Sequence, residues 1–183
     1  MTDIILTGPK HCGKTSAGKV LASLCLCDFI DLDELILQRT GKTPRQLYNE
    51  SPEIFQKAEA EAVKFLFDNP AGHVQRVIAA GGGTIDNHEA VDILKNSGAV
   101  VVYLNICAAA AWRRIASSGD GRLPPFLITE NPQETHRFLH NVRACACRQL
   151  ADFVIETEGK TPQETAIMIA NILLLEKKSI LSV

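Results

Sequence analysis

The chain has 183 residues, of which 46% are apolar, and its 19 basic and 21 acidic side chains leave a formal net charge of −2. This length and apolar content suit a single domain with one sizeable core. The balanced charge, without a basic block, argues against a nucleic-acid partner. The chain does not open on a basic, apolar leader, and the apolar run Ile167–Leu175 is too short to span a bilayer. We therefore expect a cytoplasmic protein with no membrane partner.

Strand-like apolar runs alternate with segments of helical periodicity along the chain. The predicted strands are Ile4–Thr7, Asp28–Asp31, Arg76–Ala80, Ala99–Leu104 and Phe153–Glu156. The predicted helices are Lys14–Leu26, Asp33–Arg39, Pro44–Tyr48, Glu53–Phe67, Asn87–Asn96, Ala108–Ser117, Pro132–Leu150 and Pro162–Glu176. Such alternation is typical of a parallel sheet between helices, so we expect a three-layer α/β/α fold with a five-stranded parallel sheet.

The segment after the first strand, Gly8–Thr15, matches the phosphate-loop pattern G-x-x-x-x-G-K-[ST] at every required position. It stands between a predicted strand and a predicted helix, which is the context that this loop requires. Its glycines let consecutive N–H groups converge on phosphate oxygens at the start of a helix. We expect Lys14 to neutralise the terminal phosphates of a nucleoside triphosphate and Thr15 to hold magnesium. An ordinary glycine-rich turn is the alternative.

Asp31 and Asp33 follow the second predicted strand, so both carboxylates are expected at the carboxyl edge of the sheet, beside the phosphate loop. Two acids there can serve magnesium or accept a proton from an attacking hydroxyl. Asp31 is also suited to cap the following helix, a role that is compatible with function.

Three glycines, Gly81–Gly83, directly follow the third predicted strand. They expose backbone N–H groups and allow a ligand to approach the main chain closely. Ligands of open α/β sheets bind beyond the carboxyl ends of the strands. The sequence therefore predicts that the phosphate loop, the acidic pair and the glycine turn surround one pocket.

Two segments interrupt the alternation, a helical insertion from about residue 41 to 69 and a loop from about residue 117 to 131. We expect one domain, with a core at 1–40, 70–116 and 132–183, a substrate-binding insertion and a lid. The loop places Arg122 among glycines, serines and prolines. It is either a lid that closes over bound phosphates or a surface connection, and the phosphate loop favours the lid.

Cysteines and histidines do not form a convincing metal site in the sequence. The pairs Cys25/Cys27 and Cys145/Cys147 have one intervening residue, whereas structural zinc sites usually have two to four. Both pairs fall in segments read as helical, and we expect small buried or half-buried apolar side chains. His136 and His140 stand four residues apart, and we expect them on an exposed helix face.

Taken in chain order, the phosphate loop, the acidic pair, the glycine turn, Arg122 and the segment Arg143–Asp152 resemble the shikimate kinase family over nearly the whole chain. The resemblance implies a P-loop kinase fold with a helical insertion and a lid. It also implies transfer of the ATP γ-phosphoryl group to the 3-hydroxyl of shikimate, in the pathway to aromatic amino acids, with Mg²⁺ required. We expect a monomer whose partners are ATP and shikimate.

The resemblance also implies roles for individual residues. Asp33 holds the shikimate hydroxyls and acts as base, and Arg122 reaches the phosphates from the lid; with Lys14 they are the expected catalytic residues. Arg114 is expected near the adenine. The nucleotide-binding residues are Gly8, Pro9, Lys10, His11, Cys12, Gly13, Lys14, Thr15, Ser16, Arg114 and Arg122, and the metal ligands are Thr15 and Asp31. The substrate-binding residues are Asp33, Tyr48, Phe55, Gln56, Gly81, Gly82, Gly83 and Arg143.

One departure from the family pattern concerns the acceptor. The family has an arginine in a Phe-Arg-x-x-Glu motif that pairs with the substrate carboxylate, and this chain reads Phe55-Gln56-Lys57-Ala58-Glu59. Loss of one charge-assisted bond costs about 1.5–3 kcal/mol. Lys57 is a possible substitute, although it stands about 100° around the helix from Gln56. The lid and the segment after Arg143 also differ from the family pattern.

These departures leave two alternatives to a shikimate kinase. One is a related P-loop kinase for another small hydroxy acid, as in gluconate kinase, although the triple glycine argues against it. The other is a nucleotide-binding protein that has lost catalysis and acts as a regulatory module.

Overall fold

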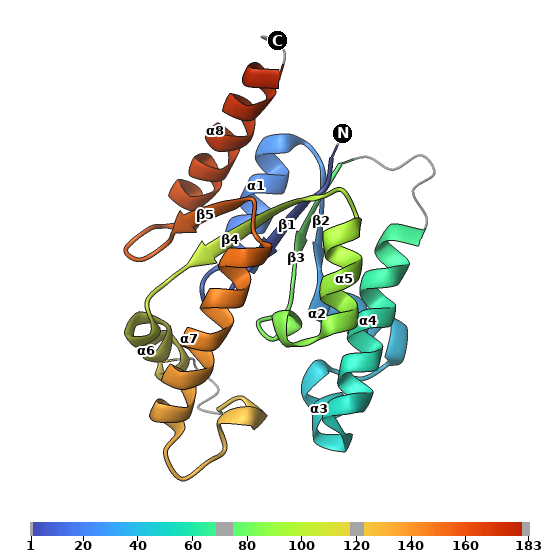
Figure 1. Cartoon of the computed structure of the whole chain (residues 1–183), viewed down its shortest axis with the longest axis vertical. Coiled ribbons are helices and arrows are strands. Elements are labelled where there is room, and N and C mark those ends of the chain that lie inside the picture. The colour runs from blue at the N-terminus through green and yellow to red at the C-terminus, as the bar shows by residue number, and fades with distance from the viewer. Residues whose placement is uncertain (1, 69–74, 118–122, 181–183) are drawn as a thin grey trace.

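The computed structural model of the chain describes residues 2–68, 75–117 and 123–180, with side chains as far as Leu174. Within these ranges, five strands form one parallel sheet in the order β2-β3-β1-β4-β5 (Figure 1). The strands are β1 (Ile4–Thr7), β2 (Asp28–Asp31), β3 (Arg76–Ala79), β4 (Val100–Asn105) and β5 (Phe153–Glu156). The fold class and all five strand positions predicted from the sequence are thereby confirmed, to within one residue at the ends of β3 and β4.

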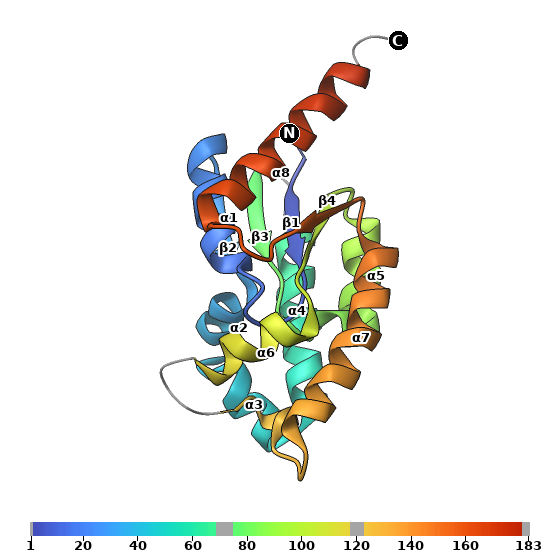
Figure 2. The same ribbon diagram turned by 90° about the vertical axis from the view of Figure 1, so that its left-hand side faces the viewer.

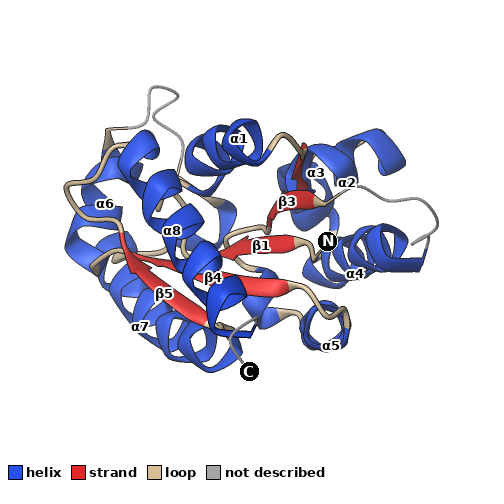
Figure 3. Ribbon diagram, turned by 90° about the horizontal axis from the view of Figure 1, so that it is seen from above, coloured by secondary structure: helices blue, strands red, loops and turns tan. Residues whose placement is uncertain are grey.

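Helices cover both faces of the sheet, as the view from above shows (Figure 3). They are α1 (Lys14–Cys25), α2 (Leu32–Thr40), α3 (Pro44–Glu50), α4 (Pro52–Asp68), α5 (His88–Asn96), α6 (Ala108–Ala116), α7 (Pro132–Leu150) and α8 (Pro162–Ile180). Two short 3₁₀ helices, η1 (Thr84–Asp86) and η2 (Pro125–Leu127), were not predicted. No helix in the described ranges is long and apolar enough to cross a membrane.

The core lies on the two faces of the central strand β1, whose four residues are all buried. Ile4 and Leu6 pack in one cluster with side chains of α1, α6 and α8, and Ile5 packs in another with side chains of α2, α4 and α5. Because successive side chains of a strand point to opposite faces, a strand covered on both sides must be apolar throughout.

The carboxyl ends of the strands point toward α3, η1 and the first turns of α7, whereas α8 extends beyond the opposite end of the sheet (Figures 1 and 2). β1 pairs with both β3 and β4, so the loops after β1 and β3 emerge next to each other. The loop after β2 follows at the same edge, because β2 pairs with β3. The sheet topology therefore brings together the three loops that the sequence marked as chemically important.

The predicted environment of the cysteine and histidine pairs was wrong in part. Cys145 is exposed, and Cys27 lies outside α1 because Leu26 ends that helix in the left-handed conformation, at φ 52°. His136 and His140 are each only 6% exposed. The His136 ring lies between the rings of Trp112 of α6 and His140, in tilted contacts with centroids 5.5 Å apart in each pair. The face of α7 that bears the two histidines is therefore covered by α6.

The buried histidine pair makes the stability of the fold depend on pH. Burial, followed by the charges of His140 and Arg143, lowers the pKa of His136 to about 4. An unfolded histidine titrates near 6.5, so between these values the unfolded chain binds more protons than the folded one. The contribution of the neutral, buried His136 ring to the free energy of unfolding is complete above the unfolded pKa. It is lost as the pH falls toward the folded pKa.

We therefore expect the free energy of unfolding to fall less in His136→Gln than in the wild type between about pH 7 and about pH 5. The difference should be on the order of 1 kcal/mol, which allows for screening by solvent. Urea titrations at the two pH values measure the difference. The matched control is His88→Gln, a change on the exposed start of α5, which should leave the slope of the wild-type chain unchanged. Equal slopes for all three proteins would contradict the expectation.

Candidate active site

The phosphate loop runs from the end of β1 to the start of α1. Gly8 has φ 142°, and a Cβ atom there would lie 2.7 Å from the Leu104 carbonyl oxygen of β4, so the turn requires glycine. Gly13 precedes α1 in the left-handed region, at φ 103°. From α6, Arg114 Nη1 donates to the His11 carbonyl at 2.9 Å and fixes the middle of the loop. The loop thus has the strand, turn and helix context predicted from the sequence.

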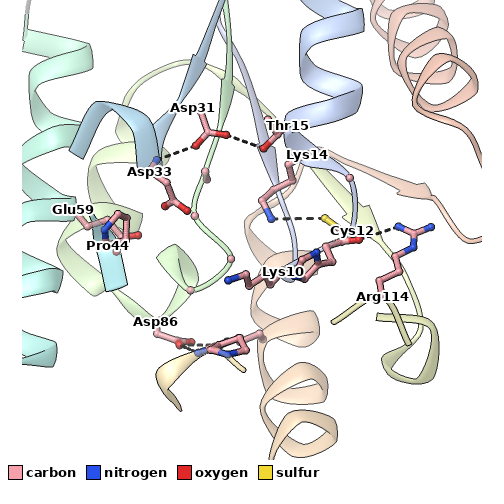
Figure 4. A pocket seen from close by; sticks show the side chains of 18 of the residues that line it. Lys10, Cys12, Lys14, Thr15, Asp31, Asp33, Pro44, Glu59, Asp86 and Arg114 are labelled. Carbon is pink, nitrogen blue, oxygen red and sulfur yellow. Dashed lines mark hydrogen bonds and ion pairs between the residues drawn. The ribbon is translucent and has the colours of Figure 1, made fainter. Parts of the chain in front are cut away.

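The Lys14 side chain folds back across its own loop. Its Nζ donates to the Gly8 carbonyl at 2.8 Å and to the Pro9 carbonyl at 3.0 Å, and it lies 3.8 Å from Cys12 Sγ (Figure 4). The residue is only 9% exposed. An ammonium group held this way is a fixed positive charge inside the curve of the loop, suited to terminal phosphate oxygens.

Asp31 connects the acidic pair to the phosphate loop. Its Oδ2 accepts from Thr15 Oγ1 at 2.7 Å, and its Oδ1 accepts from the Asp33 backbone N–H at 3.0 Å, so it also caps α2 (Figure 4). Asp33 is exposed and lines the cavity, where the surrounding protein removes part of the water around its carboxylate. This desolvation, followed by the charge of Asp31, raises the pKa of Asp33.

The glycine turn touches both the phosphate loop and the acidic pair. A Cβ atom on Gly82 would lie 3.0 Å from the Lys10 backbone nitrogen and 3.2 Å from its Cα, so the two main chains are in close contact. A Cβ atom on Gly81 would lie 3.3 Å from Asp33 Oδ1. The predicted convergence of the three loops is therefore present in the structure.

A buried carboxylate that sequence analysis did not select lies behind the glycine turn. Glu59 of α4 is 1% exposed and accepts from Thr84 Oγ1 at 2.6 Å and from Asn87 Nδ2 at 2.9 Å. Burial raises the pKa of Glu59, and the two hydrogen bonds oppose this effect. Its bond with Thr84, the residue after the glycine turn, links the turn to α4, and a Cβ atom on Gly81 would lie 3.1 Å from Glu59 Oε1. In the sequence, Glu59 could have been selected as a site residue because it belongs to the same motif as Phe55.

Arg143 enters the site from α7 and forms an ion pair with Asp86 of η1. The Asp86 Oδ2 atom accepts from Arg143 Nε at 2.9 Å and lies 2.6 Å from Nη2. The guanidinium also lies over the Phe126 ring, 4.8 Å from its centroid. Asp86 was not predicted as a site residue, because a pairing across 57 positions leaves no local trace in the sequence.

These groups line one cavity of about 720 Å³, within the range of small-molecule sites. Tyr48 and Phe55 form part of its wall, with ring centroids 6.2 Å apart in an edge-on contact. Gln56 lines the cavity beside them, and its backbone carbonyl accepts from Asn87 Nδ2 at 2.8 Å. Lys57 is exposed and is not among the cavity residues, so it does not replace the family arginine.

Most of the predicted site residues meet in this cavity, with three exceptions. Gly8 and Pro9 shape the loop through their carbonyls and do not line the cavity. Arg122 lies outside the described residues, and of the predicted lid the structure describes Ser117 and the part from Leu123 onward. The lining residues from that part are Pro124, Pro125 and Phe126. The cavity is also lined by Lys160 and Thr157, which follow β5 and carry no sequence motif.

Comparison with known proteins identifies the family to which the chain is similar. The family model described as shikimate kinase matches residues 10–173. A shikimate kinase from Thermodesulfovibrio yellowstonii is 34% identical over 167 residues, which cover 91% of both chains. Another, from a Marinomonas species, is 33% identical over 165 residues, covering 90% of this chain and 87% of the relative.

Solved structures agree with the sequence comparison. The shikimate kinase of Acinetobacter baumannii, solved in complex with shikimate, has a TM-score of 0.85 and 30% identity, covering 97% of this chain and 95% of its own. A gluconokinase from Sinorhizobium meliloti, at 14% identity and a TM-score of 0.57, shares the fold alone. The phosphate loop, the acidic pair and the glycine turn thus line one cavity in a chain that matches shikimate kinases over most of its length. The chain belongs to the shikimate kinase family of ATP-dependent kinases.

Proposed function

We propose that the protein transfers the γ-phosphoryl group of ATP to the 3-hydroxyl of shikimate. The observation that carries this proposal is the contact between the Gly82 and Lys10 main chains, with Asp33 beside the same turn. It puts the nucleotide loop and the acceptor residues around a single cavity, so that an acceptor hydroxyl can reach the terminal phosphate. Membership in the family supplies the identity of the acceptor.

In this proposal the chain works mainly by positioning and charge neutralisation. Lys14 holds the phosphate oxygens, and Arg114 stands near the adenine. Asp33 binds the acceptor hydroxyls and receives the proton of the attacking one, and its raised pKa makes the carboxylate a better base. Tyr48 and Phe55 pack against the ring, and Arg143 binds the carboxylate. The segment from about 117 to 131, with Arg122, closes over the phosphates, and residues from about 41 to 69 form the acceptor-binding insertion.

The side chains at Thr15 and Asp31 fit a magnesium ion. Both offer oxygen, the ligand type that Mg²⁺ prefers, and their oxygens are 2.7 Å apart beside the phosphate loop. Magnesium usually keeps few protein ligands and takes the rest from phosphates and water, so a larger carboxylate cluster is not needed. When bound, the ion would neutralise charge on the phosphates. A cytoplasmic monomer is the state that we propose for the enzyme.

A coupled assay of ADP release with shikimate, ATP and Mg²⁺ tests the proposal. We expect Mg²⁺-dependent turnover with shikimate that exceeds turnover with gluconate. Faster turnover with gluconate or another hydroxy acid would reassign the acceptor. Binding of ATP without turnover of any acceptor in the panel would instead favour a regulatory protein.

The contact between the glycine turn and the phosphate loop gives a steric prediction. In Gly82→Ala the new methyl group meets the Lys10 main chain, and crowding of this kind costs about 1–3 kcal/mol. We expect kcat/KM for both substrates to fall by about tenfold. In Gly83→Ala the nearest atom is 3.8 Å away, so that variant should lose less activity. An equal loss in the two variants would contradict the steric explanation.

A further inference from the structure

An anionic acceptor meets three acidic side chains in the part of the cavity next to the glycine turn. Asp33, Glu59 and Asp86 line it, and Gln56 stands where the family pattern has a carboxylate-binding arginine. Arg143 is present, but Asp86 contacts both its Nε and its Nη2 atom. This ion pair has little net charge, so Arg143 by itself is a weak partner for a second carboxylate.

Arg45 of α3 also lines this cavity, in addition to Arg143 and Arg114. Its backbone belongs to a well-defined helix start. Thr43 and Gln46 form a capping box there, and Pro44 occupies the first helical position. The residue is half-buried and is followed two positions later by Leu47, which anchors α3 in the core.

Arg45 and Arg143 reach the same short segment from different helices. Arg45 Nη2 donates to the Leu123 carbonyl at 2.7 Å, and the Arg143 guanidinium lies over the ring of Phe126, three residues further along. The segment from Leu123 to Leu127 therefore has a guanidinium from α3 at one end and one from α7 at the other. A guanidinium has five N–H donors, so a bond to a carbonyl is compatible with a further bond to an anion.

The position of Arg45 is not explained by local helix preferences. A positive charge in the first turn of a helix lies at the positive end of the helix dipole, where it is unfavourable. Residues that break a local rule of this kind are expected at functional sites.

We infer that Arg45 binds the carboxylate of the acceptor together with Arg143, in place of the arginine that Gln56 has replaced. The inference rests on the proposed function and adds a specificity residue to it. The planar fork of arginine suits a carboxylate because it donates two parallel hydrogen bonds.

The experiment compares shikimate with its methyl ester, which has the same ring and hydroxyls but no charge. In Arg45→Ala we expect kcat/KM for shikimate to fall about 10- to 100-fold, with less than about a threefold change for the ester. The KM for ATP should not change. Arg45→Lys keeps the charge without the fork, so its kcat/KM for shikimate should lie between those of the wild type and Arg45→Ala.

In the double variant Arg45→Ala/Gln56→Arg, the guanidinium at the family position should restore activity on shikimate. Lys57→Ala removes a neighbouring charge outside the cavity and is the matched control.

Several outcomes would overturn the inference. If Arg45→Ala lowers activity on shikimate and on the ester equally, Arg45 only supports the Leu123 segment. Unchanged activity on shikimate, or the absence of rescue by Gln56→Arg, would also overturn it while leaving the proposed function intact. A wild-type enzyme that does not phosphorylate shikimate would overturn both. Thermal melts of each variant show that the compared proteins are folded.

Discussion

Lys14→Ala should abolish most phosphoryl transfer, with kcat about 10²- to 10³-fold below that of the wild type. The wild-type ammonium is fixed by the Gly8 and Pro9 carbonyls, so its charge is preorganised where phosphate oxygens gain charge in the transition state. Lys14→Arg should recover little, because a planar fork does not fit the place of a compact ammonium inside the loop. The coupled ADP assay at saturating shikimate measures both variants.

Lys19→Ala is the control for this change, since it removes a lysine that lies over Phe29 and not in the cavity. It should retain wild-type kcat. A Lys14→Ala enzyme that keeps more than about a tenth of the wild-type kcat would mean that the phosphates are held elsewhere.

Asp33→Asn should lower kcat/KM for the acceptor by about 10²-fold or more, because it removes both the proton acceptor and a charged hydrogen-bond partner of the hydroxyls. The backbone of Asp33 would still donate to Asp31, so the cap of α2 and the contact from Asp31 to Thr15 should survive. Affinity for ATP is therefore expected to remain. Steady-state kinetics with each substrate varied in turn separate the two effects.

Glu34→Gln is the matched control for Asp33, because Glu34 is the next acid on α2 and does not line the cavity. Its kinetics should match the wild type. If Asp33→Asn weakens ATP and shikimate binding equally, Asp33 has a structural role at the loop and is not the base.

The fold was predictable because its signals are local. A strand such as β1 is buried on both faces and is apolar in sequence, and the helices show their own periodicity. The short 3₁₀ helices were missed because three residues leave no periodic signal. The burial of His136 and His140 was missed for a different reason: α6 covers that face of α7, and polar residues in a helix do not reveal what packs against them.

The site was predictable as far as its residues belong to contiguous motifs. Gly8–Thr15, the acidic pair and the glycine turn are each read from neighbouring residues, and parallel strand order brings them together. Asp86 and Arg45 depend on contacts with residues 57 and 78 positions away, so that only the folded chain identifies them. Glu59 is intermediate, because its motif was visible but its burial behind Gly81 was not.

A crystal structure with ADP and shikimate bound tests the central claim most directly. We expect the acceptor ring between Asp33 and Gly82, with its hydroxyls toward Asp33 and its carboxylate at Arg143 and Arg45. Shikimate bound outside the cavity, or inside it with its hydroxyls turned away from both Asp33 and the phosphate loop, would contradict the account.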